Sequence, residues 1–268
     1  MGKNFAYVPG AEFPFQYKYE HMAVTTDCVI LTYEDRKLKV LLVRRGAEPY
    51  KGKWAFPGGF LRVNETAEQG ALRELREETA LKPSSIGQLG VFSGIDRDPC
   101  ERVITIAWYA LVKPSEVMGG DDADEAAWFP VDDIPPLAFD HGKILRSALE
   151  RLRRDIHFQP VGFNLLDDEF TIPDLQRLYE AILGVEFDRR NFQRKILASG
   201  ILEEAGSLEQ STLMGDSCYS SVYMAYDMSE PAMDGMPRKG RQGRPGNLFR
   251  LNRKRYDQMK EDGGKLEF

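Results

Sequence analysis

Two apolar stretches near the start of the chain have the composition of β-strands. Residues 22–33 (MAVTTDCVILTY) and 38–44 (LKVLLVR) are rich in β-branched and aliphatic side chains, and the polar tripeptide Glu34-Asp35-Arg36 lies between them. A short polar break between two such runs predicts a β-hairpin. Later runs of the same kind predict further strands at Val91–Phe92, Val103–Val112 and Ala126–Val131.

Helical periodicity appears first in the segment that follows this hairpin. Thr66–Thr79 is expected to form a helix with Asn64 as its N-cap. Residues 142–156 (GKILRSALERLRRDI) place apolar side chains at helical spacing and predict an amphipathic helix that closes the first structural unit.

The last third of the chain carries two shorter helical patterns. Thr171 or Asp174 can cap a helix over Leu175–Leu183, and Asp188 can cap a second helix over Arg189–Ala198. Gly184 and Gly200 follow these helices and suit their C-termini. A strand is expected to begin at Ile201-Leu202, and Asn247–Leu251 is placed to return beside it.

The length of 268 residues corresponds to about two domains of ordinary size. We expect a first domain over residues 1–157, with an irregular N-terminal segment 1–20, and a second domain over 158–268. The second contains an inserted loop at about 205–236, which is rich in Ser, Met and Gly.

Composition excludes several protein classes. With 42% hydrophobic and 29% charged residues, the chain has the balance of a soluble protein. Its longest uncharged apolar run, Val103–Val112, is ten residues long, about half of what a membrane span requires. The 3 cysteines form no CxxC pair, which argues against a disulfide framework or a zinc site and favours a reducing cytoplasm.

Positive charge is concentrated locally on an acidic chain. The net charge of −6 argues against a protein that coats nucleic acid by bulk charge. Residues 238–255 nevertheless hold eight basic side chains and no acidic one, and a second basic cluster lies at residues 189–195. A solvated surface remains the alternative interpretation of both clusters.

The segment from Gly59 to Leu81 (GFLRVNETAEQGALRELREETAL) carries the strongest chemical signal. On a helix, Glu74, Glu77 and Glu78 fall within one arc of about 100°. Three carboxylates on one stripe repel one another, and a bound cation reverses that penalty. Oxygen-only ligands favour Mg²⁺ or Mn²⁺.

Residues next to this stripe complete the candidate site. Gly58 and Gly59 allow the backbone to approach a metal closely, and the Gly58 carbonyl is a candidate ligand. Arg73 is placed to form a charge-assisted pair with Glu65. The alternative is an exposed helix face that is simply rich in Glu and Arg.

The complete pattern resembles the Nudix box, the signature of Nudix hydrolases. The residues in register are Gly59, Glu65, Arg73, Glu74, Leu75, Glu77, Glu78 and Leu81. One position departs, because Ala80 stands where the family has Gly. If that residue has a positive φ, alanine costs roughly 1 kcal/mol there, which a helix end can tolerate.

The resemblance implies an α/β fold, namely an α/β/α sandwich around a mixed sheet over about residues 20–157. It implies metal binding by Glu74, Glu77 and Glu78 with the Gly58 carbonyl nearby, and a bracing role for Glu65 and Arg73. Family members cleave a diphosphate that links a nucleoside to another group. The general base varies within the family, and the resemblance gives only a weak preference for Glu74.

Ligand contacts outside the box are less clearly indicated. Gly59 and Phe60 border the metal loop, and Phe60 is the better candidate for stacking on a base. Arg97 lies in the charged loop Asp96–Pro99 and is a candidate partner for a phosphate or a ribose, although a simple turn explains the same loop. His141 is interpreted as a capping or surface residue.

Two short helices followed by two strands around a loop outline a winged helix-turn-helix. The second helix carries Arg and Asn side chains, which suit base edges and phosphates, and the wing adds further arginines. The candidate DNA contacts are Arg189, Arg190, Asn191, Arg194, Lys195, Arg241 and Arg244. A helical dimerisation module is the alternative.

The order of these parts resembles the NrtR-type transcription regulators of NAD metabolism. That resemblance implies a Nudix unit that senses ADP-ribose-like nucleoside diphosphates and a winged helix that binds double-stranded operator DNA as a homodimer. The enlarged wing departs from the short wing of that family and puts its DNA-facing geometry in doubt. The intact acidic residues leave ADP-ribose hydrolysis open.

Two other functions stay open at this point. One is a Mg²⁺-dependent ADP-ribose pyrophosphatase whose C-terminal domain serves dimerisation only. The other is a hydrolase that acts on a different nucleoside diphosphate compound. The sequence determines neither the ligand nor the operator.

Overall fold

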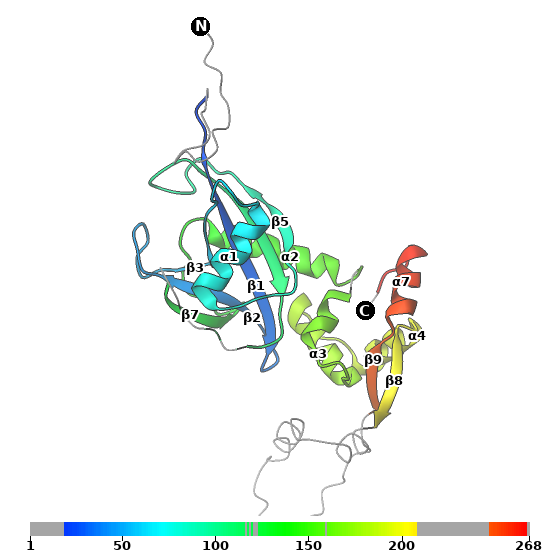
Figure 1. Ribbon diagram of the computed structural model, residues 1–268. Coiled ribbons are helices and arrows are strands. Elements are labelled where there is room, and N and C mark those ends of the chain that lie inside the picture. Colours follow the sequence, from blue (N-terminus) through cyan, green and yellow to red (C-terminus); the bar gives the residue numbers. More distant parts are fainter. Residues whose placement is uncertain are drawn as a thin grey trace, which may run out of the picture. The chain divides into compact units, whose positions relative to one another are not determined.

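The computed structural model describes residues 19–115, 117, 119, 123–158, 160–207 and 247–266 (Figure 1). The chain divides into two compact units, Met1–Leu152 and Arg153–Phe268. The division falls within helix α2 (His141–Asp155), close to the expected boundary after residue 157.

A seven-stranded mixed sheet forms the centre of the first unit. The path runs β3-β2-β1-β6-β5, with β4 also paired to β1 and β7 to β2. The β1–β6 pair is parallel and the other pairs are antiparallel. The strands are β1 (Ala23–Glu34), β2 (Lys37–Arg45), β3 (Trp54–Ala55), β4 (Gly58–Phe60), β5 (Gly87–Phe92), β6 (Val103–Leu111) and β7 (Ala123–Pro130).

The predicted hairpin between β1 and β2 is confirmed. Its turn residues Asp35 and Arg36 both have positive φ, 51° and 61°, as a two-residue turn of the tightest hairpins requires. Lys39 stabilises the turn by donating to Glu34 at 2.7 Å and to Asp35 at 2.9 Å.

Helix α1 (Ala67–Thr79) and helix α2 cover opposite faces of the sheet (Figure 1). Ala71 and Leu75 of α1 pack against Cys28 and Ile30 of β1. Residue 27 points to the other face, because side chains alternate along a strand, and there it meets His141 at the start of α2. The mixed α/β/α sandwich expected from the sequence is therefore confirmed.

The N-cap of α1 differs from the expectation. Thr66, not Asn64, accepts the hydrogen bond from the Gln69 amide, and the Gln69 side chain accepts from the Thr66 amide. This reciprocal capping box needs Gln three residues after the cap, and only Thr66 has that spacing. At the other end, Ala80 adopts the left-handed conformation with φ 62°, so alanine takes the geometry that the family assigns to glycine.

The second unit contains two helices followed by an antiparallel strand pair. Tyr179 of α3 and Phe192 of α4 are buried and meet edge to face, with ring centroids 6.0 Å apart. The elements are the 3-10 helix η1 (Pro160–Leu165), α3 (Ile172–Leu183), α4 (Arg189–Ala198), β8 (Leu202–Ser207), β9 (Asn247–Leu251) and α7 (Arg253–Glu261). This order is that of a winged helix-turn-helix, as predicted.

Three details of this unit depart from the sequence reading. Helix α3 begins at Ile172 and not at Leu175, while its predicted cap Thr171 is confirmed and Asp174 completes the capping box. Helix α7 was not predicted, because Tyr256 is the only buried residue that its span offers. The expected insertion begins too early, since residues 205–207 belong to β8, and residues 208–236 lie outside the described residues.

In the part of the chain that the structure describes, no helix is long and apolar enough to span a membrane.

The cap assignment is testable by paired substitutions. Thr66→Ala removes the side-chain acceptor of the capping box and should lower the free energy of unfolding by about 1 kcal/mol. Asn64→Ala should change it by no more than about 0.5 kcal/mol, as is usual for an exposed residue outside special features. Urea unfolding of both variants checks this, and a larger loss for Asn64→Ala would contradict the assignment.

Candidate functional site

The acidic stripe lies on the half-buried side of α1. Ala71 and Leu75 face the sheet and fix the rotation of the helix. That rotation leaves Glu74, Glu77 and Glu78 at the edge of the buried face, all of them partly covered. Their grouping on one side of the helix is as the sequence predicted.

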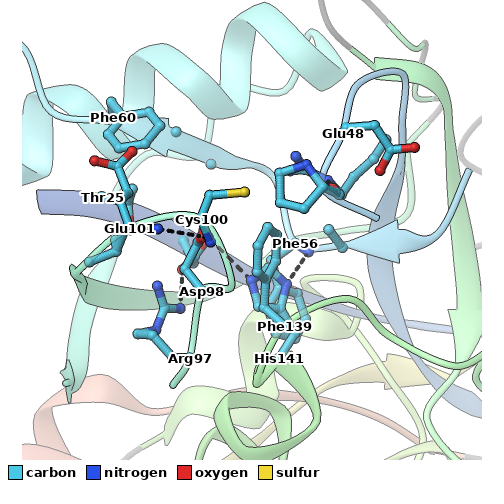
Figure 2. A pocket seen from close by; sticks show the side chains of 17 residues that line it. Thr25, Glu48, Phe56, Phe60, Arg97, Asp98, Cys100, Glu101, Phe139 and His141 are labelled. Atoms are coloured by element: carbon cyan, nitrogen blue, oxygen red, sulfur yellow. Dashed lines mark hydrogen bonds and ion pairs between the residues drawn. The ribbon is translucent and has the colours of Figure 1, made fainter. Parts of the chain in front are cut away.

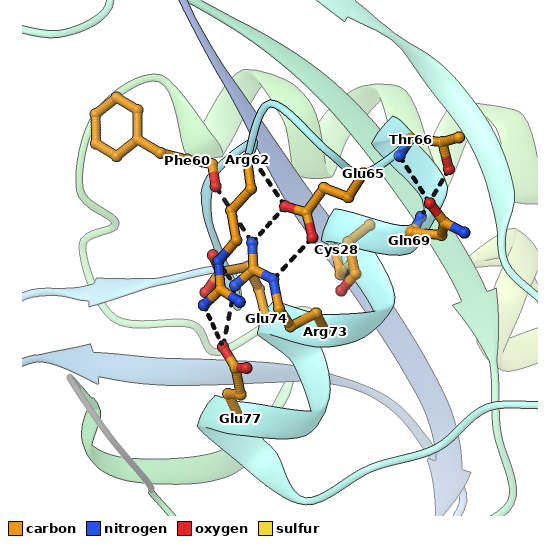
Figure 3. Close-up of polar contacts among 10 residues, drawn as sticks. Cys28, Phe60, Arg62, Glu65, Thr66, Gln69, Arg73, Glu74 and Glu77 are labelled. Atoms are coloured by element: carbon orange, nitrogen blue, oxygen red, sulfur yellow. Dashed lines mark hydrogen bonds and ion pairs between the residues drawn. The ribbon is translucent and has the colours of Figure 1, made fainter. Parts of the chain in front are cut away.

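Arg73 holds the polar side of this helix together (Figure 3). Its guanidinium donates to both oxygens of Glu65, from Nη2 to Oε1 at 2.6 Å and from Nε to Oε2 at 2.9 Å. The same group reaches Glu74 Oε1 at 2.6 Å and Glu77 Oε2 at 3.0 Å. The predicted Glu65–Arg73 pair is therefore present, and Arg73 also donates hydrogen bonds to two residues of the stripe.

The hydrogen bonds set the protonation of the groups around Arg73. They hold the pKa of Glu65 down to about 2, with the bonds from Arg73 as the largest cause. The same contacts raise the pKa of Arg73 above its ordinary value. Both groups stay charged at any physiological pH, so this brace is an ion pair as well as a pair of hydrogen bonds.

Glu78 and Glu74 differ from Glu65, because burial raises their pKa. The pKa of Glu78 rises to about 8, mainly through loss of solvent, although its carboxylate accepts a hydrogen bond from the Gly58 amide at 2.8 Å. Glu74 lies against the backbone of Gly59, where a Cβ atom would come within 2.6 Å of its Oε1. A side chain at residue 59 would therefore push the Glu74 carboxylate away from its present position.

The donor set of the stripe suits a divalent cation. Its ligand atoms are carboxylate oxygens, which hard cations prefer, and a nearby cation would favour the charged form of the buried acids. Among the described residues, no group of three His, Cys, Asp or Glu side chains already converges on one point. Glu74 and Glu77 turn to Arg73 and Glu78 turns to Gly58, so an ion competes with those contacts.

A pocket of about 330 Å³ lies beside Gly58 and Gly59 (Figure 2). Phe60 stands at its rim and is 54% exposed, which keeps it available for stacking. Phe56 and Phe139 contribute apolar surface to the lining. The pocket and the acidic stripe thus share one stretch of backbone, and the candidate residues Gly58, Gly59 and Phe60 all line the pocket.

His141 does not behave as predicted. It is only 3% exposed, so it is not a surface residue. Its Nδ1 accepts a hydrogen bond from the Phe56 amide at 2.9 Å, and its ring stacks on Phe56 with centroids 5.0 Å apart. Burial lowers the pKa of His141 and favours the neutral ring, whose proton is then on Nε2, 3.6 Å from Asp27 Oδ1.

Arg97 also lies deeper than a surface loop residue would. It is 7% exposed and pairs with Asp140 at 3.0 Å and with Asp27 at 3.5 Å. Sequence reasoning found Arg97 but missed Asp27 and Asp140. The available signal for Asp27 was a charged residue in the middle of an otherwise apolar strand, in MAVTTDCVIL.

Helix α4 presents a basic surface in the second unit. Phe192 and Ile196 are buried and anchor one side of the helix. The five candidate DNA contacts on it are exposed, and none forms an ion pair with another described residue: Arg189, Arg190, Asn191, Arg194 and Lys195. Within this set, Arg194 donates to the Asn191 side chain at 3.0 Å.

The wing is only partly described. Arg241 and Arg244, the two wing candidates, lie outside the described residues. Arg250 of β9 pairs with Glu169 at 3.0 Å and lies 3.9 Å from Glu203, so acidic neighbours already engage it. Within the described second unit, α4 and the start of α7 carry seven exposed basic side chains: Arg189, Arg190, Arg194, Lys195, Arg253, Lys254 and Arg255.

The brace around Arg73 gives a pH-dependent prediction. Glu65→Gln should lower the free energy of unfolding by about 1 to 2 kcal/mol at neutral pH, because a charge-assisted pair is lost. Glu65 has a depressed pKa when folded, so its contribution is present above its ordinary value of 4.5 and falls as the pH drops toward 2. Urea unfolding at pH 7 and pH 3 should give a clearly smaller difference at pH 3.

Glu150→Gln is the matched control, since Glu150 is an exposed acid on α2. It should have little effect at either pH. An equal loss for Glu65→Gln at pH 7 and pH 3 would contradict the ion-pair explanation.

Each of the two units matches a known protein family. A family model of the NUDIX domain matches residues 22–148, and one of the NrtR DNA-binding winged helix domain matches residues 162–214. An ADP-ribose pyrophosphatase of Methanocaldococcus jannaschii is 44% identical over 131 residues, which cover 49% of this chain and 75% of that protein.

Two relatives extend over both units. An ADPR responsive transcriptional repressor, NtrR of Acinetobacter baylyi, is 28% identical over 228 residues, covering 82% of this chain and 90% of that protein. The crystal structure of Shewanella oneidensis NrtR complexed with a 27mer DNA is similar with a TM-score of 0.61 and 30% identity, covering 87% of this chain and 95% of that one. The chain therefore belongs to the Nudix superfamily and, within it, to the NrtR-type proteins that join a Nudix domain to a winged-helix DNA-binding domain.

Proposed function

We propose that this protein is a transcription regulator that responds to ADP-ribose or a related nucleoside diphosphate. The observation that carries the proposal is the presence of a complete acidic Nudix box and an exposed basic recognition helix in one chain. The likeness to an ADPR responsive repressor over 82% of this chain supports it. We take the two units to be residues 1–157 and 158–268.

The ligand is expected at the pocket beside Gly58 and Gly59, with its diphosphate toward the acidic stripe. Mg²⁺ or Mn²⁺ is the proposed ion, held by Glu74, Glu77 and Glu78 with the Gly58 carbonyl. When bound, such an ion neutralises diphosphate oxygens and lowers the pKa of an attacking water. Arg73 and Glu65 position the stripe, Phe60 stacks on the base, and Arg97 contributes to the ligand pocket.

Hydrolysis of ADP-ribose is a second candidate function of the same site. It is favoured because no acidic residue of the box is lost, and because the first unit is 44% identical to an ADP-ribose pyrophosphatase. A regulator that also cleaves its ligand would limit the duration of its own signal. A pure hydrolase with a dimerisation module, by contrast, gives no reason for five exposed polar and basic side chains on α4.

DNA binding is assigned to α4 and the wing. Arg189, Arg190 and Lys195 are free of described ion pairs and can contact phosphates or bases without first breaking one. Asn191 and Arg194 bond each other and can act as a preformed pair. Arg241 and Arg244 are proposed as wing contacts, and a homodimer would present two such surfaces to a palindromic operator.

The DNA surface can be tested by substitution. Arg190→Ala and Arg194→Ala should each weaken binding to an operator duplex by about tenfold and reduce its salt dependence, because each removes a cation that displaces counterions. Fluorescence anisotropy at several salt concentrations measures both effects. Arg146→Ala, an exposed arginine on α2, is the control, and ADP-ribose affinity should stay unchanged in all three variants.

Catalysis is tested separately at the box. Glu77→Gln should abolish Mg²⁺-dependent release of AMP from ADP-ribose, a loss of at least about a hundredfold if the carboxylate holds the metal. Chromatographic assay of AMP checks it, with Glu150→Gln expected to keep full activity. A wild-type protein that binds ADP-ribose but releases no AMP would make the site a sensor and not an enzyme.

A further inference from the structure

The polar groups at the floor of the pocket are incompletely bonded. The Thr25 hydroxyl, Asp27 Oδ2 and Arg97 Nε are buried and make no hydrogen bond within the described part of the chain. Asp27 and Arg97 are each only 7% exposed, and all three residues line the pocket. Buried polar groups without partners are costly and uncommon, so three at one pocket call for an explanation.

Other contacts hold these side chains in place without using the unbonded atoms. Asp140 accepts a hydrogen bond from Arg97 Nη2 at 3.0 Å, which fixes the guanidinium but leaves Nε unused. Arg97 Nη2 lies 3.5 Å from Asp27 Oδ2, an ion pair that lacks a hydrogen bond. His141 flanks the other oxygen of Asp27 at 3.6 Å. These side chains are therefore held in place, with one acceptor, one donor and one hydroxyl unbonded. Each of the three atoms has less than 1 Å² of exposed surface, so a ligand group reaches it only after a small side-chain movement.

The charge of the pocket decides what kind of group fits there. Asp27 and Asp140 already neutralise Arg97, which makes Arg97 a poor phosphate site. Acidic side chains outnumber basic ones in the lining, four to two: Asp27, Glu48, Asp98 and Glu101 against Arg45 and Arg97. A phosphate would be repelled here, whereas a neutral hydroxyl can donate to a carboxylate and accept from a guanidinium.

We propose that Thr25, Asp27 and Arg97 form a recognition site for the vicinal hydroxyls of a ribose. One hydroxyl donates to Asp27 Oδ2 and accepts from Arg97 Nε, and its neighbour bonds the Thr25 hydroxyl. The shared backbone at Gly58 and Gly59 then places the ribose next to a diphosphate at the acidic stripe. This inference rests on the proposed function. It extends that function by naming the part of the ligand that the pocket binds.

Thr25→Val is the sharpest test, because it removes a hydroxyl that bonds nothing in the described structure and keeps the side-chain shape. The midpoint of thermal unfolding should not fall, while affinity for ADP-ribose should drop about five- to tenfold. Thr26→Val is the matched control: its hydroxyl is also buried and unbonded, but Thr26 does not line the pocket, and affinity should stay within about twofold. Calorimetry with the full chain, and Ca²⁺ in place of Mg²⁺ to limit turnover, gives the affinities.

Deoxy analogues of ADP-ribose identify the hydroxyl. One analogue lacks the 2′-hydroxyl of the adenosine and the other lacks the 2-hydroxyl of the distal ribose. At least one should bind wild type about tenfold more weakly than ADP-ribose, and that loss should shrink in Thr25→Val and in Asp27→Asn, since the bond is already gone.

The outcomes separate the two proposals. Equal affinities of wild type, Thr25→Val and Asp27→Asn for ADP-ribose, within twofold, would overturn the ribose site and leave the proposed function standing. Analogues that bind wild type as tightly as ADP-ribose would do the same. A wild-type protein that binds no ADP-ribose would remove the proposed function and this site with it.

Discussion

The candidate site depends on the hydrogen bonds that the guanidinium of Arg73 donates. It bonds Glu65 from the loop before α1 and two residues of the acidic stripe, with distances between 2.6 and 3.0 Å. Without this cation, several carboxylates on one helical face would repel one another, and the loop after β4 would lose the ion pair between Glu65 and α1. A divalent ion at the stripe would share this task, because both stabilise the same negative charges.

Strand β1 connects the two sides of the site. Its even-numbered residues, such as Cys28 and Ile30, pack under α1, while Thr25 and Asp27 belong to the pocket lining and Asp27 meets His141 of α2. The pairing of β4 with β1 at Asp27–Gly58 brings the glycines between these two faces. The acidic stripe and the polar pocket floor are therefore neighbours because of one strand and one short pairing.

The second unit uses a different physical principle. A small aromatic core of Tyr179, Phe187 and Phe192 holds α3 and α4 together. Because that core occupies one side of α4, the arginines are left on the exposed side. The two units thus separate two chemistries: ionic groups held near a pocket, and cations kept in solvent where they can meet a polyanion.

The sequence by itself determined the hairpin, the helix with its acidic stripe, the Glu65–Arg73 pair and the winged-helix order, because each follows from local periodicity or from fixed spacing along the chain. It misplaced the cap at Asn64 and missed α7, whose single buried side chain gives almost no periodic signal. The environment of Arg97 and His141 was decided only by the tertiary structure. Asp27, Arg97 and Asp140 are far apart in the chain, and only the meeting of β1, the loop between β5 and β6, and the start of α2 brings their charges together and buries them.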